Sequence, residues 1–355
     1  MHITYYRPPN PTVSFHLVAE HYVQELRHQG VTVQVRDLLF TPEWLKTTEP
    51  QDNSIAIVHP LFYFANWQGL TFPQIVETLQ FRHRFIFGME VADTTSISDR
   101  FVSWANHPGL TSLFLPSQFS MQAFKNSGVT TPLVLIPHGV GVDPTGGAQQ
   151  AAPLQQGKFD FLKQEKIPKV LVFMLHEPFR KGWDLVERLI PQFPELLFVI
   201  RGPMKQGVNS ITRQENILLI QEWLSEADLS SLYHNCDLLL SLHRGGAFEL
   251  NCLEALASGL PVITTRYGSI LDYLDDTNAH LVKVSKMVPL NPTGSDHNGL
   301  GATADLDDAK RVLEQLVAQL PKFKQQAALA GQKIREEFSW ERMTTVLIDS
   351  MQQFM

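Results

Sequence analysis

Basic, glycine and acidic residues follow one apolar run at a spacing that suits phosphate binding. Residues 238–242 predict a buried strand; His243 and Arg244 come next, then two glycines, and a helix is predicted over about 250–258. Glycines between a strand and a helix let the backbone approach a ligand, and N–H groups at a helix start bind anions. Glu254, one turn into the helix, could accept the paired hydroxyls of a ribose. The pattern therefore predicts a nucleotide diphosphate at a helix N-terminus, although a tight turn before a core helix would look the same.

This stretch resembles the donor-binding segment of retaining GT-B glycosyltransferases of family 4. Their pattern is Glu-Gly-Phe-Gly-Leu, three further residues, Glu-Ala, and then a Gly-x-Pro-Val strand. The first part is matched by Gly246-Ala247-Phe248-Glu249-Leu250, and the rest by Leu253-Glu254-Ala255-Leu256 and Gly259-Leu260-Pro261-Val262. The first Glu of the family pattern, which usually touches the donor sugar, is Gly246 here. We hypothesise that Glu249, which replaces the second glycine, supplies an alternative contact, and the resemblance implies that Glu254 holds the ribose.

A second basic pair follows the apolar run over residues 169–174. The family usually has Gly-Arg, four residues and then Lys-Gly, with the Arg and Lys clasping the diphosphate. Lys181-Gly182 match this pattern; His176 stands at the expected Arg position, and Arg180 lies beside the lysine. Lysine binds phosphate as a point charge and arginine as a fork. A basic pair is more often a solvated face, but its place in a loop after a core strand favours phosphate binding.

The base of the nucleotide is expected further along the same half of the chain. Trp223 follows a predicted strand over 217–221 and could stack on a nucleobase, although a packed surface aromatic is an equal interpretation. The predicted donor- or nucleotide-binding residues are Arg180, Lys181, Trp223, His243, Arg244, Gly246, Ala247, Phe248, Leu250 and Glu254.

Candidate catalytic residues in the first half lie where predicted strands end, as ligands do on parallel sheets. Glu90 follows the apolar run 84–89, where a carboxylate must find solvent, a partner or a ligand. In similar glycosyltransferases a Glu at this point often faces the cleft. His138 lies in a Pro-His-Gly-Val stretch that resembles the family's hinge entry, with Asp143 two residues late; a role in the turn is an equal alternative. We predict Glu90, His138 and Glu249 as catalytic, and expect His59 to bond a neighbouring carbonyl.

Short apolar runs alternate with helical patterns over most of the chain, which is typical of parallel sheets covered on both faces. A stretch rich in Pro, Gly, Ala and Gln over 141–168 marks a boundary. We predict an N-terminal Rossmann-like acceptor domain over 1–145, a linker over 146–167, a donor domain over 168–338 and a crossover helix over 339–355. Residues 282–287 are predicted to form an edge strand, and 289–303 a surface loop. The resemblance implies an α/β GT-B fold, with two Rossmann-like domains facing across a cleft and the C-terminal helix crossing back.

The composition excludes several classes of function. The 355 residues carry a formal net charge of -7, which offers no basic field for nucleic acid. The two cysteines, Cys236 and Cys252, lie in or beside apolar runs, as core thiols in a reducing compartment do. No apolar run reaches the roughly 18 residues of a membrane span. We expect no leader, because the sequence opens with a predicted strand. We therefore expect a cytoplasmic protein, with peripheral membrane contact left open.

The resemblance implies a transferase of glycan biosynthesis that moves a hexose or related sugar from a nucleotide-diphosphate sugar to a sugar or other hydroxyl acceptor, with retention. Cations and a helix end would neutralise the phosphates, so no metal and no other cofactor is expected; the pair Asp275-Asp276 lies outside the relevant loop. Two alternatives remain. One is a catalytically degenerate, glycosyltransferase-like binding protein, favoured by Gly246 and His176. The other is a different GT-B enzyme, such as a sugar-nucleotide epimerase.

Overall fold

The computed structural model describes residues 1–10, 14–38, 54–62, 70–141, 157–175, 177–203, 210–290 and 296–355. The chain divides into two compact units. The first comprises Met1–Gly139, Asn291–Gly299 and Trp340–Met355, and the second Val140–Leu290 and Leu300–Ser339. Asp143 and the predicted linker as far as residue 156 lie outside the described residues. Its described part contains a 3-10 helix, Asp160–Gln164, which contacts the second unit's helix α7 (Glu226–Asn235).

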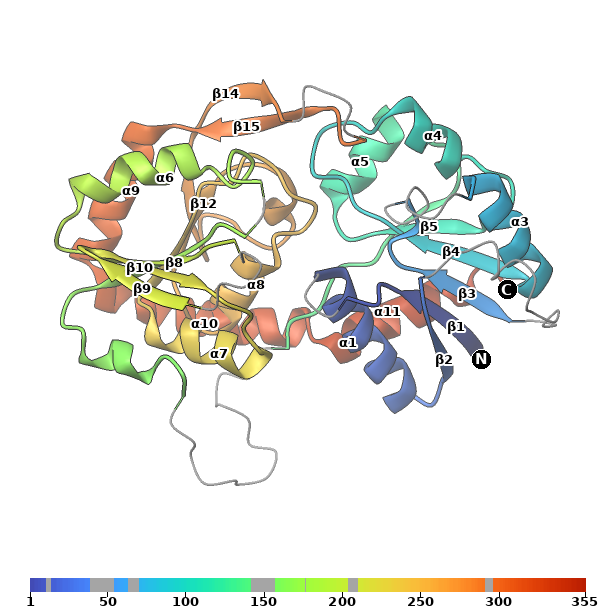
Figure 1. Cartoon of the computed structure of the whole chain (residues 1–355), viewed down its shortest axis with the longest axis horizontal. Coiled ribbons are helices and arrows are strands. Elements are labelled where there is room, and N and C mark those ends of the chain that lie inside the picture. Colours follow the sequence, from blue (N-terminus) through green and yellow to red (C-terminus); the bar gives the residue numbers. More distant parts are fainter. Residues whose placement is uncertain are drawn as a thin grey trace. The chain divides into compact units, whose positions relative to one another are not determined.

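The first unit is built on a six-stranded sheet in the order β2-β1-β3-β4-β5-β6, with every neighbouring pair parallel. Helices cover both faces of this sheet (Figure 1). Apolar side chains of α3, α4 and α5 pack on one face, while α1 and α11 pack together on the other. The bounds are β1 His2–Arg7, α1 Ser14–His28, β2 Thr32–Asp37, β3 Ile55–Val58, α3 Phe72–Arg82, β4 Phe85–Met89, α4 Asp99–Ala105, β5 Ser112–Leu115, α5 Gln118–Asn126, β6 Leu133–Leu135 and α11 Trp340–Gln352.

The second unit has a seven-stranded sheet in the order β13-β12-β11-β7-β8-β10-β9, parallel except for β9. Helices α6 and α9 pack on one face, and α7, α8 and α10 on the other (Figure 1). The bounds are β7 Lys169–Phe173, α6 Trp183–Leu189, β8 Leu197–Arg201, β9 Ser210–Gln214, β10 Ile217–Gln221, β11 Leu238–Ser241, α8 Leu250–Ala257, β12 Val262–Thr265, β13 His280–Val282, β14 Val284–Pro289, β15 Leu300–Ala304, α9 Leu306–Ala318 and α10 Leu320–Glu337.

Local sequence explains where several helices begin and end. Ser117, Ser225 and Asp305 each accept a hydrogen bond from the backbone N–H three residues on, which satisfies a free donor at the starts of α5, α7 and α9. Gly259 follows α8 with a φ of 77°, a conformation that glycine adopts without strain. Side-chain caps therefore fix the starts of α5, α7 and α9, and a glycine fixes the end of α8.

The segment after β13 differs from the prediction. The predicted edge strand over 282–287 is confirmed over 284–287, which lie in β14. It begins later than predicted, because β13 ends at Val282, and it belongs to a separate antiparallel ribbon with β15. The predicted surface loop is wrong over its last residues, which form β15. This strand consists largely of small residues, and a Cβ on Gly301 would lie 2.4 Å from the carbonyl oxygen of Arg244. The close approach requires residues too small to show an apolar strand pattern.

The helix α11 completes the first unit from the far end of the sequence, as the crossover prediction expects. Trp340 stacks on His21 with ring centroids 4.7 Å apart and meets Tyr22 edge-on at 5.1 Å. Leu347 is fully buried. Gly139 makes room for the indole, since a Cβ there would lie 2.6 Å from Trp340 Cδ2. The apolar stripe of α11 is therefore part of the first unit's core.

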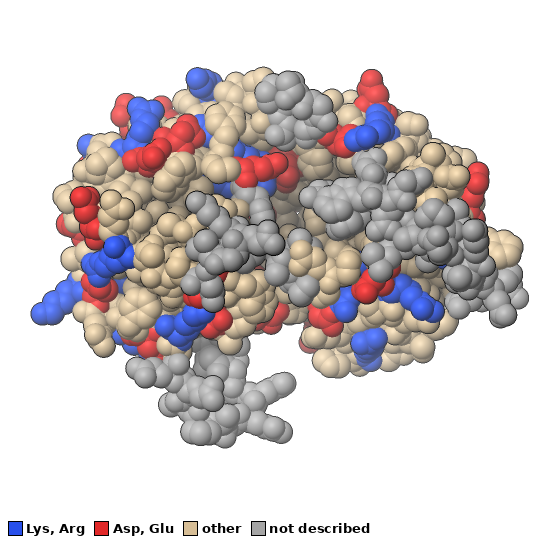
Figure 2. Space-filling model, viewed as in Figure 1, with Lys and Arg blue, Asp and Glu red and all other residues tan. Residues whose placement is uncertain are grey.

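The surface offers no large field of one charge in the view of Figure 2, where Lys and Arg lie among Asp and Glu over the described residues. In the same described ranges, no helix is both long and apolar enough to span a membrane. Cys236 and Cys252 are both free and buried, as expected of core thiols.

Candidate functional site

The predicted donor site lies where the order of strands in the second unit reverses. From β7, the chain builds β8 and β10 to one side of the sheet and β11 and β12 to the other. Ligands of parallel α/β sheets bind beyond the carboxyl ends of the strands at such a point. The loop after β7 carries Arg180 and Lys181, and the loop after β11 carries residues 242–249. Two strands that are neighbours in space thus bring the two predicted basic motifs together.

A close backbone contact joins these two loops. Arg244 N donates to Arg180 O at 2.7 Å. Gly182 has a φ of 75°, and a Cβ at this residue would lie 2.0 Å from Leu242 O. Only glycine therefore fits the crossing, which explains the Lys181-Gly182 pair in structural terms.

Lys181 and Arg180 surround the buried carboxylate of Glu249. Lys181 Nζ donates to Glu249 Oε1 and Oε2 at 2.9 and 2.8 Å, and Arg180 Nη1 lies 3.6 Å from Oε1. Burial by itself would raise the pKa of Glu249, but the charges of Lys181, His243 and Arg180 outweigh it and lower that pKa. Glu249 is therefore ionised, and its charge keeps the two cations beside the start of α8.

Glu249 also fills the space that a side chain at residue 246 would take. A Cβ built on Gly246 would lie 2.1 Å from Glu249 Oε1. Glu249 precedes α8 with φ 55° and ψ 60°, a left-handed conformation that is uncommon for a residue with a side chain. The Tyr273 hydroxyl donates to the carbonyls of Phe248 and Glu249 at 2.7 and 2.9 Å and so supports this turn.

The start of α8 carries the remaining residues of the predicted phosphate loop. Ala247 and Phe248 are buried, and Phe248 packs against the Tyr273 ring at a centroid distance of 5.3 Å. The helix begins at Leu250, and no side chain caps it. The partial positive charge of the helix end thus lies beside Glu249, Lys181 and Arg180.

Glu254 lies on the second turn of α8, where Tyr233 fixes its carboxylate. The Tyr233 hydroxyl donates to Glu254 Oε2 at 2.7 Å. The Tyr233 ring meets Phe173, the last residue of β7, at a centroid distance of 5.8 Å. Burial raises the pKa of Tyr233 well above its usual value, so this phenol remains a donor. Glu254 therefore lies near the carboxyl end of β7, as a ribose ligand on this sheet would.

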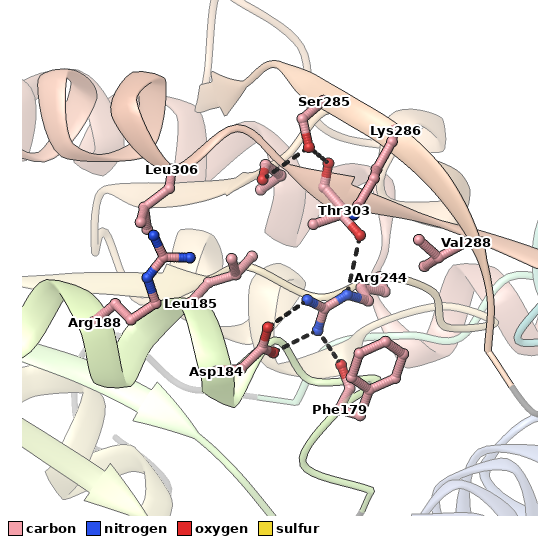
Figure 3. A pocket seen from close by; sticks show the side chains of 11 residues that line it. Phe179, Asp184, Leu185, Arg188, Arg244, Ser285, Lys286, Val288, Thr303 and Leu306 are labelled. Carbon is pink, nitrogen blue, oxygen red and sulfur yellow. Dashed lines mark hydrogen bonds and ion pairs between the residues drawn. The ribbon is translucent and has the colours of Figure 1, made fainter.

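Arg244, predicted to bind the donor, contacts other groups of the second unit. Its guanidinium forms a bidentate pair with Asp184 and also donates to the Phe179 carbonyl and the Thr303 hydroxyl (Figure 3). These groups line a cavity of ≈ 330 Å³. The Arg244 side chain is only 3% exposed, whereas that of Asp184 is 52% exposed. The charge of Arg244 is therefore neutralised inside the unit.

Charged residues that the sequence prediction missed lie at the edge that carries Trp223. Trp223 is 45% exposed, while Arg201 at the end of β8 and Glu222 after β10 are buried. Lys158 Nζ pairs with Glu222 Oε1 at 2.9 Å. The available signal was a charged residue at the end of an apolar run, the signal that identified Glu90.

Glu90 and His138 lie in the first unit and contact different neighbours. Glu90 accepts from the backbone N–H groups of Phe62 and Val91, and burial raises its pKa to about 8. Burial lowers the pKa of His138 to about 3. His59 bonds the Tyr5 hydroxyl at 3.1 Å, so the expected carbonyl partner is wrong; a buried tyrosine that needs a partner takes its place. Glu90 therefore holds the turn at Phe62 by accepting its backbone N–H.

In the described part of the chain, no group of three or more His, Cys, Asp or Glu residues could hold a metal ion. Asp276 pairs instead with Arg266, and Asp275 accepts from Thr277 within a turn. His176, which stands at the family's Arg position, lies outside the described residues.

Comparison with known proteins matches the segment that contains the predicted donor site. Residues 157–287 match the family model described as glycosyl transferases group 1. A putative glycosyltransferase of the Sulfolobus islandicus filamentous virus is 29% identical over 266 residues, or 71% of this chain and 69% of the viral protein. An uncharacterized protein of Sulfolobus islandicus rod-shaped virus 1 is 27% identical over 99% of this chain and 98% of its own length. The chain is therefore similar to group 1 glycosyl transferases over residues 157–287, and to a putative glycosyltransferase over most of its length.

Solved structures share the fold over nearly the whole chain. Anabaena HepE, solved in complex with UDP and glucose, has a TM-score of 0.69 at 14% identity, covering 99% of this chain and 100% of HepE. Sucrose-phosphate synthase from Thermosynechococcus elongatus has a TM-score of 0.68 at 12% identity, covering 99% and 98%. The chain therefore has the α/β GT-B fold, with a Rossmann-like sheet in each unit.

Proposed function

We propose that this protein transfers a sugar, a hexose or a related one, from a nucleotide-diphosphate sugar bound by its second unit. One observation carries the proposal: Arg180 and Lys181 meet Glu249 at the uncapped start of α8, where the strand order reverses. The family match covers this whole segment. Two cations and a helix N-terminus are what a departing diphosphate needs, because they stabilise the charge that develops on it.

Each group would act on a stated part of the donor. Lys181 and Arg180 would bind the diphosphate, which competes with Glu249 for the ammonium group. Glu249 would then face the donor sugar from the space next to Gly246, as the family's first Glu does. Glu254 would accept the ribose hydroxyls, with its second oxygen held by Tyr233. In line with the resemblance to family 4, we propose transfer with retention to a hydroxyl acceptor bound by the first unit, as part of glycan biosynthesis.

UDP is the first nucleotide to test. HepE was solved with UDP and with UDP-glucose, and the pneumococcal O-GlcNAc transferase GtfA with UDP and GlcNAc. These ligands belong to those proteins; in this chain the exposed indole of Trp223, which follows β10, supports a nucleoside diphosphate as well.

A thermal-shift panel with UDP, GDP, ADP, dTDP and CMP tests the proposal. A nucleotide at a hundred times its dissociation constant should add roughly 2.7 kcal/mol of stability to the parent. Glu254→Ala should lose this shift, and Tyr233→Phe should reduce it. Glu314→Ala, which removes an exposed carboxylate on α9, serves as the matched control and should keep it. A folded parent that responds to none of the five nucleotides would instead support the degenerate binding protein.

Product analysis separates transfer from other GT-B reactions. Incubation with the stabilising nucleotide's sugar donor and an acceptor should release the nucleoside diphosphate. An epimerase would return a changed sugar nucleotide without needing an acceptor. If Glu249→Ala transfers normally while Glu254→Ala does not, the role given to Glu249 is wrong.

A further inference from the structure

We infer that Arg244 is a positioning residue, which holds the loop carrying Arg180 and Lys181 in place and does not contact the donor phosphates. This inference rests on the proposed function for its kinetic consequence, but its structural part can be tested without any nucleotide. It assigns to the pair of Arg244, which is buried, and Asp184, which is half-exposed, the task of shaping the phosphate site.

The guanidinium of Arg244 is already occupied. Its Nη1 and Nη2 donate to the two carboxylate oxygens of Asp184 at 2.7 and 2.8 Å, Nε donates to Thr303 Oγ1 at 3.1 Å, and Nη1 also donates to the Phe179 carbonyl. The group lies over the Phe179 ring, 4.1 Å from its centroid. Arginine has five N–H donors, and these bonds engage four of them. A phosphate would have to break this set before it could use the fork.

The contacts of Arg244 bracket the basic loop at both ends. Phe179 precedes Arg180 and Lys181, and Asp184 follows them in the first turn of α6. Thr303 ties the same guanidinium to β15, and the Arg244 backbone bonds Arg180 on one side and Ala302 on the other, both at 2.7 Å. One residue therefore fixes the loop after β7 against the loop after β11 and the ribbon beside them.

The exposed fractions of the two side chains also support a positioning role for Arg244. The Asp184 side chain is 52% exposed and lines the cavity of Figure 3, while the Arg244 side chain is 3% exposed. An anion that enters this cavity meets the carboxylate before the guanidinium. Removing Asp184 would leave the buried charge of Arg244 uncompensated, which is costly even where the intact pair adds little. Changing Arg244 would remove the bonds that join Asp184, Phe179 and Thr303 to one guanidinium. The loop should therefore loosen when either partner is changed.

Asp184→Asn distinguishes positioning from direct binding, because the two roles predict opposite signs. If Arg244 positions the loop, Asp184→Asn and Arg244→Lys should each raise the dissociation constant for UDP about tenfold. The double variant should have a dissociation constant no higher than that of the single variant that binds UDP less tightly. If Arg244 binds phosphate, Asp184→Asn should free its fork and leave binding unchanged or tighter. Calorimetric titration of UDP decides between them, and the second result would overturn the inference.

The matched control is Arg188→Gln, which removes a charge from the same cavity and the same helix. It should leave UDP binding unchanged. Thr303→Val is a milder variant that removes only the Nε acceptor, so it should weaken binding less than Asp184→Asn while keeping the fold. Equal weakening in Arg188→Gln and Asp184→Asn would contradict the inference, because the two variants change the net charge in opposite directions and would then share only a general disturbance of the cavity.

Hydrogen exchange gives the readout that needs no nucleotide. The amides of Lys181, Gly182 and Trp183 donate to Glu177, Phe179 and Pro178 at 3.1, 3.1 and 2.9 Å. They should exchange faster in Asp184→Asn and Arg244→Lys, but not in Arg188→Gln. Unchanged exchange overturns the inference even if UDP binds. Faster exchange in a protein that binds no nucleotide supports the positioning role and counts against the proposed function.

Discussion

Glu249 combines two roles that the family pattern divides between separate positions. It adopts the left-handed backbone of a glycine position, and its carboxylate lies where the side chain of residue 246 would be. The residue types predicted this exchange, since one pattern lost its Glu and gained another three residues later. The distance of 2.1 Å between Glu249 Oε1 and a Cβ on Gly246 shows that one carboxylate at most fits here.

Gly246→Ala should expel the Glu249 carboxylate from its place beside Lys181. We expect a loss of stability of about 1–3 kcal/mol from overpacking, together with weaker nucleotide binding. Urea unfolding and UDP titration would measure the two effects. A variant as stable as the parent would show that the two groups do not compete for this space.

The exchanged pair Gly246→Glu with Glu249→Gly should restore what Gly246→Glu alone destroys. The double variant returns a carboxylate to the pocket of Lys181 and gives the left-handed position to a glycine. We expect transfer activity within about tenfold of the parent, against a much larger loss in Gly246→Glu. An inactive, folded double variant would show that residue 246 does not reach the site that Glu249 occupies.

Glu90 should make the first unit less stable in mild base. Its pKa is raised from 4.5 to about 8 by burial, so folding favours the protonated carboxyl. The contribution to stability is complete below pH 4.5 and is lost as the pH rises to about 8, a change on the order of a few kcal/mol. Urea unfolding of the parent and Glu90→Gln at pH 5 and 8.5 would show it: the parent should lose more stability than the variant, and parallel losses would contradict the assignment.

At the scale of elements, the crossing of the loops after β7 and β11 depends on Gly182. Gly182→Ala should cost about 3 kcal/mol or more, because it combines a left-handed backbone with a clash against Leu242 O. Gly268→Ala is the matched control: it has a φ of 83° in the same unit but no atom within 4 Å, so it should cost only about 1 kcal/mol. Equal unfolding midpoints would mean that the crossing relaxes.

Most elements could be predicted from sequence, because apolar periodicity and caps determine them. Strand β10 has the predicted bounds, since an apolar run marks it, and a Ser cap marks the start of helix α5. Strand β9 was missed because Ser-Ile-Thr-Arg-Gln is largely polar, and it pairs only at the sheet edge. The role of Arg244 could not be predicted, because its partners Asp184 and Thr303 come from distant segments and only folding brings them together.

At the scale of the whole molecule, the fold was predictable because the resemblance spans most of the chain, and the solved GT-B structures share it. Within the first unit, Leu347→Ala on α11 should cost about 2–5 kcal/mol, because the leucine is fully buried. Gln352→Ala at the exposed end of the same helix should cost little. Thermal or urea unfolding would show the difference, and equal stabilities would mean that α11 is not part of this core.

The place of α11 also sets an order of events during synthesis. Translation proceeds at about 5–20 residues per second, so the roughly 200 residues between Gly139 and Trp340 take about 10–40 s to make. Throughout that time only α1, of the two helices on this face of the first sheet, has been made, so the part that α11 covers lacks its helix. The unit that is translated first is therefore completed last, and the nascent chain exposes an apolar surface for tens of seconds in which chaperones can bind it.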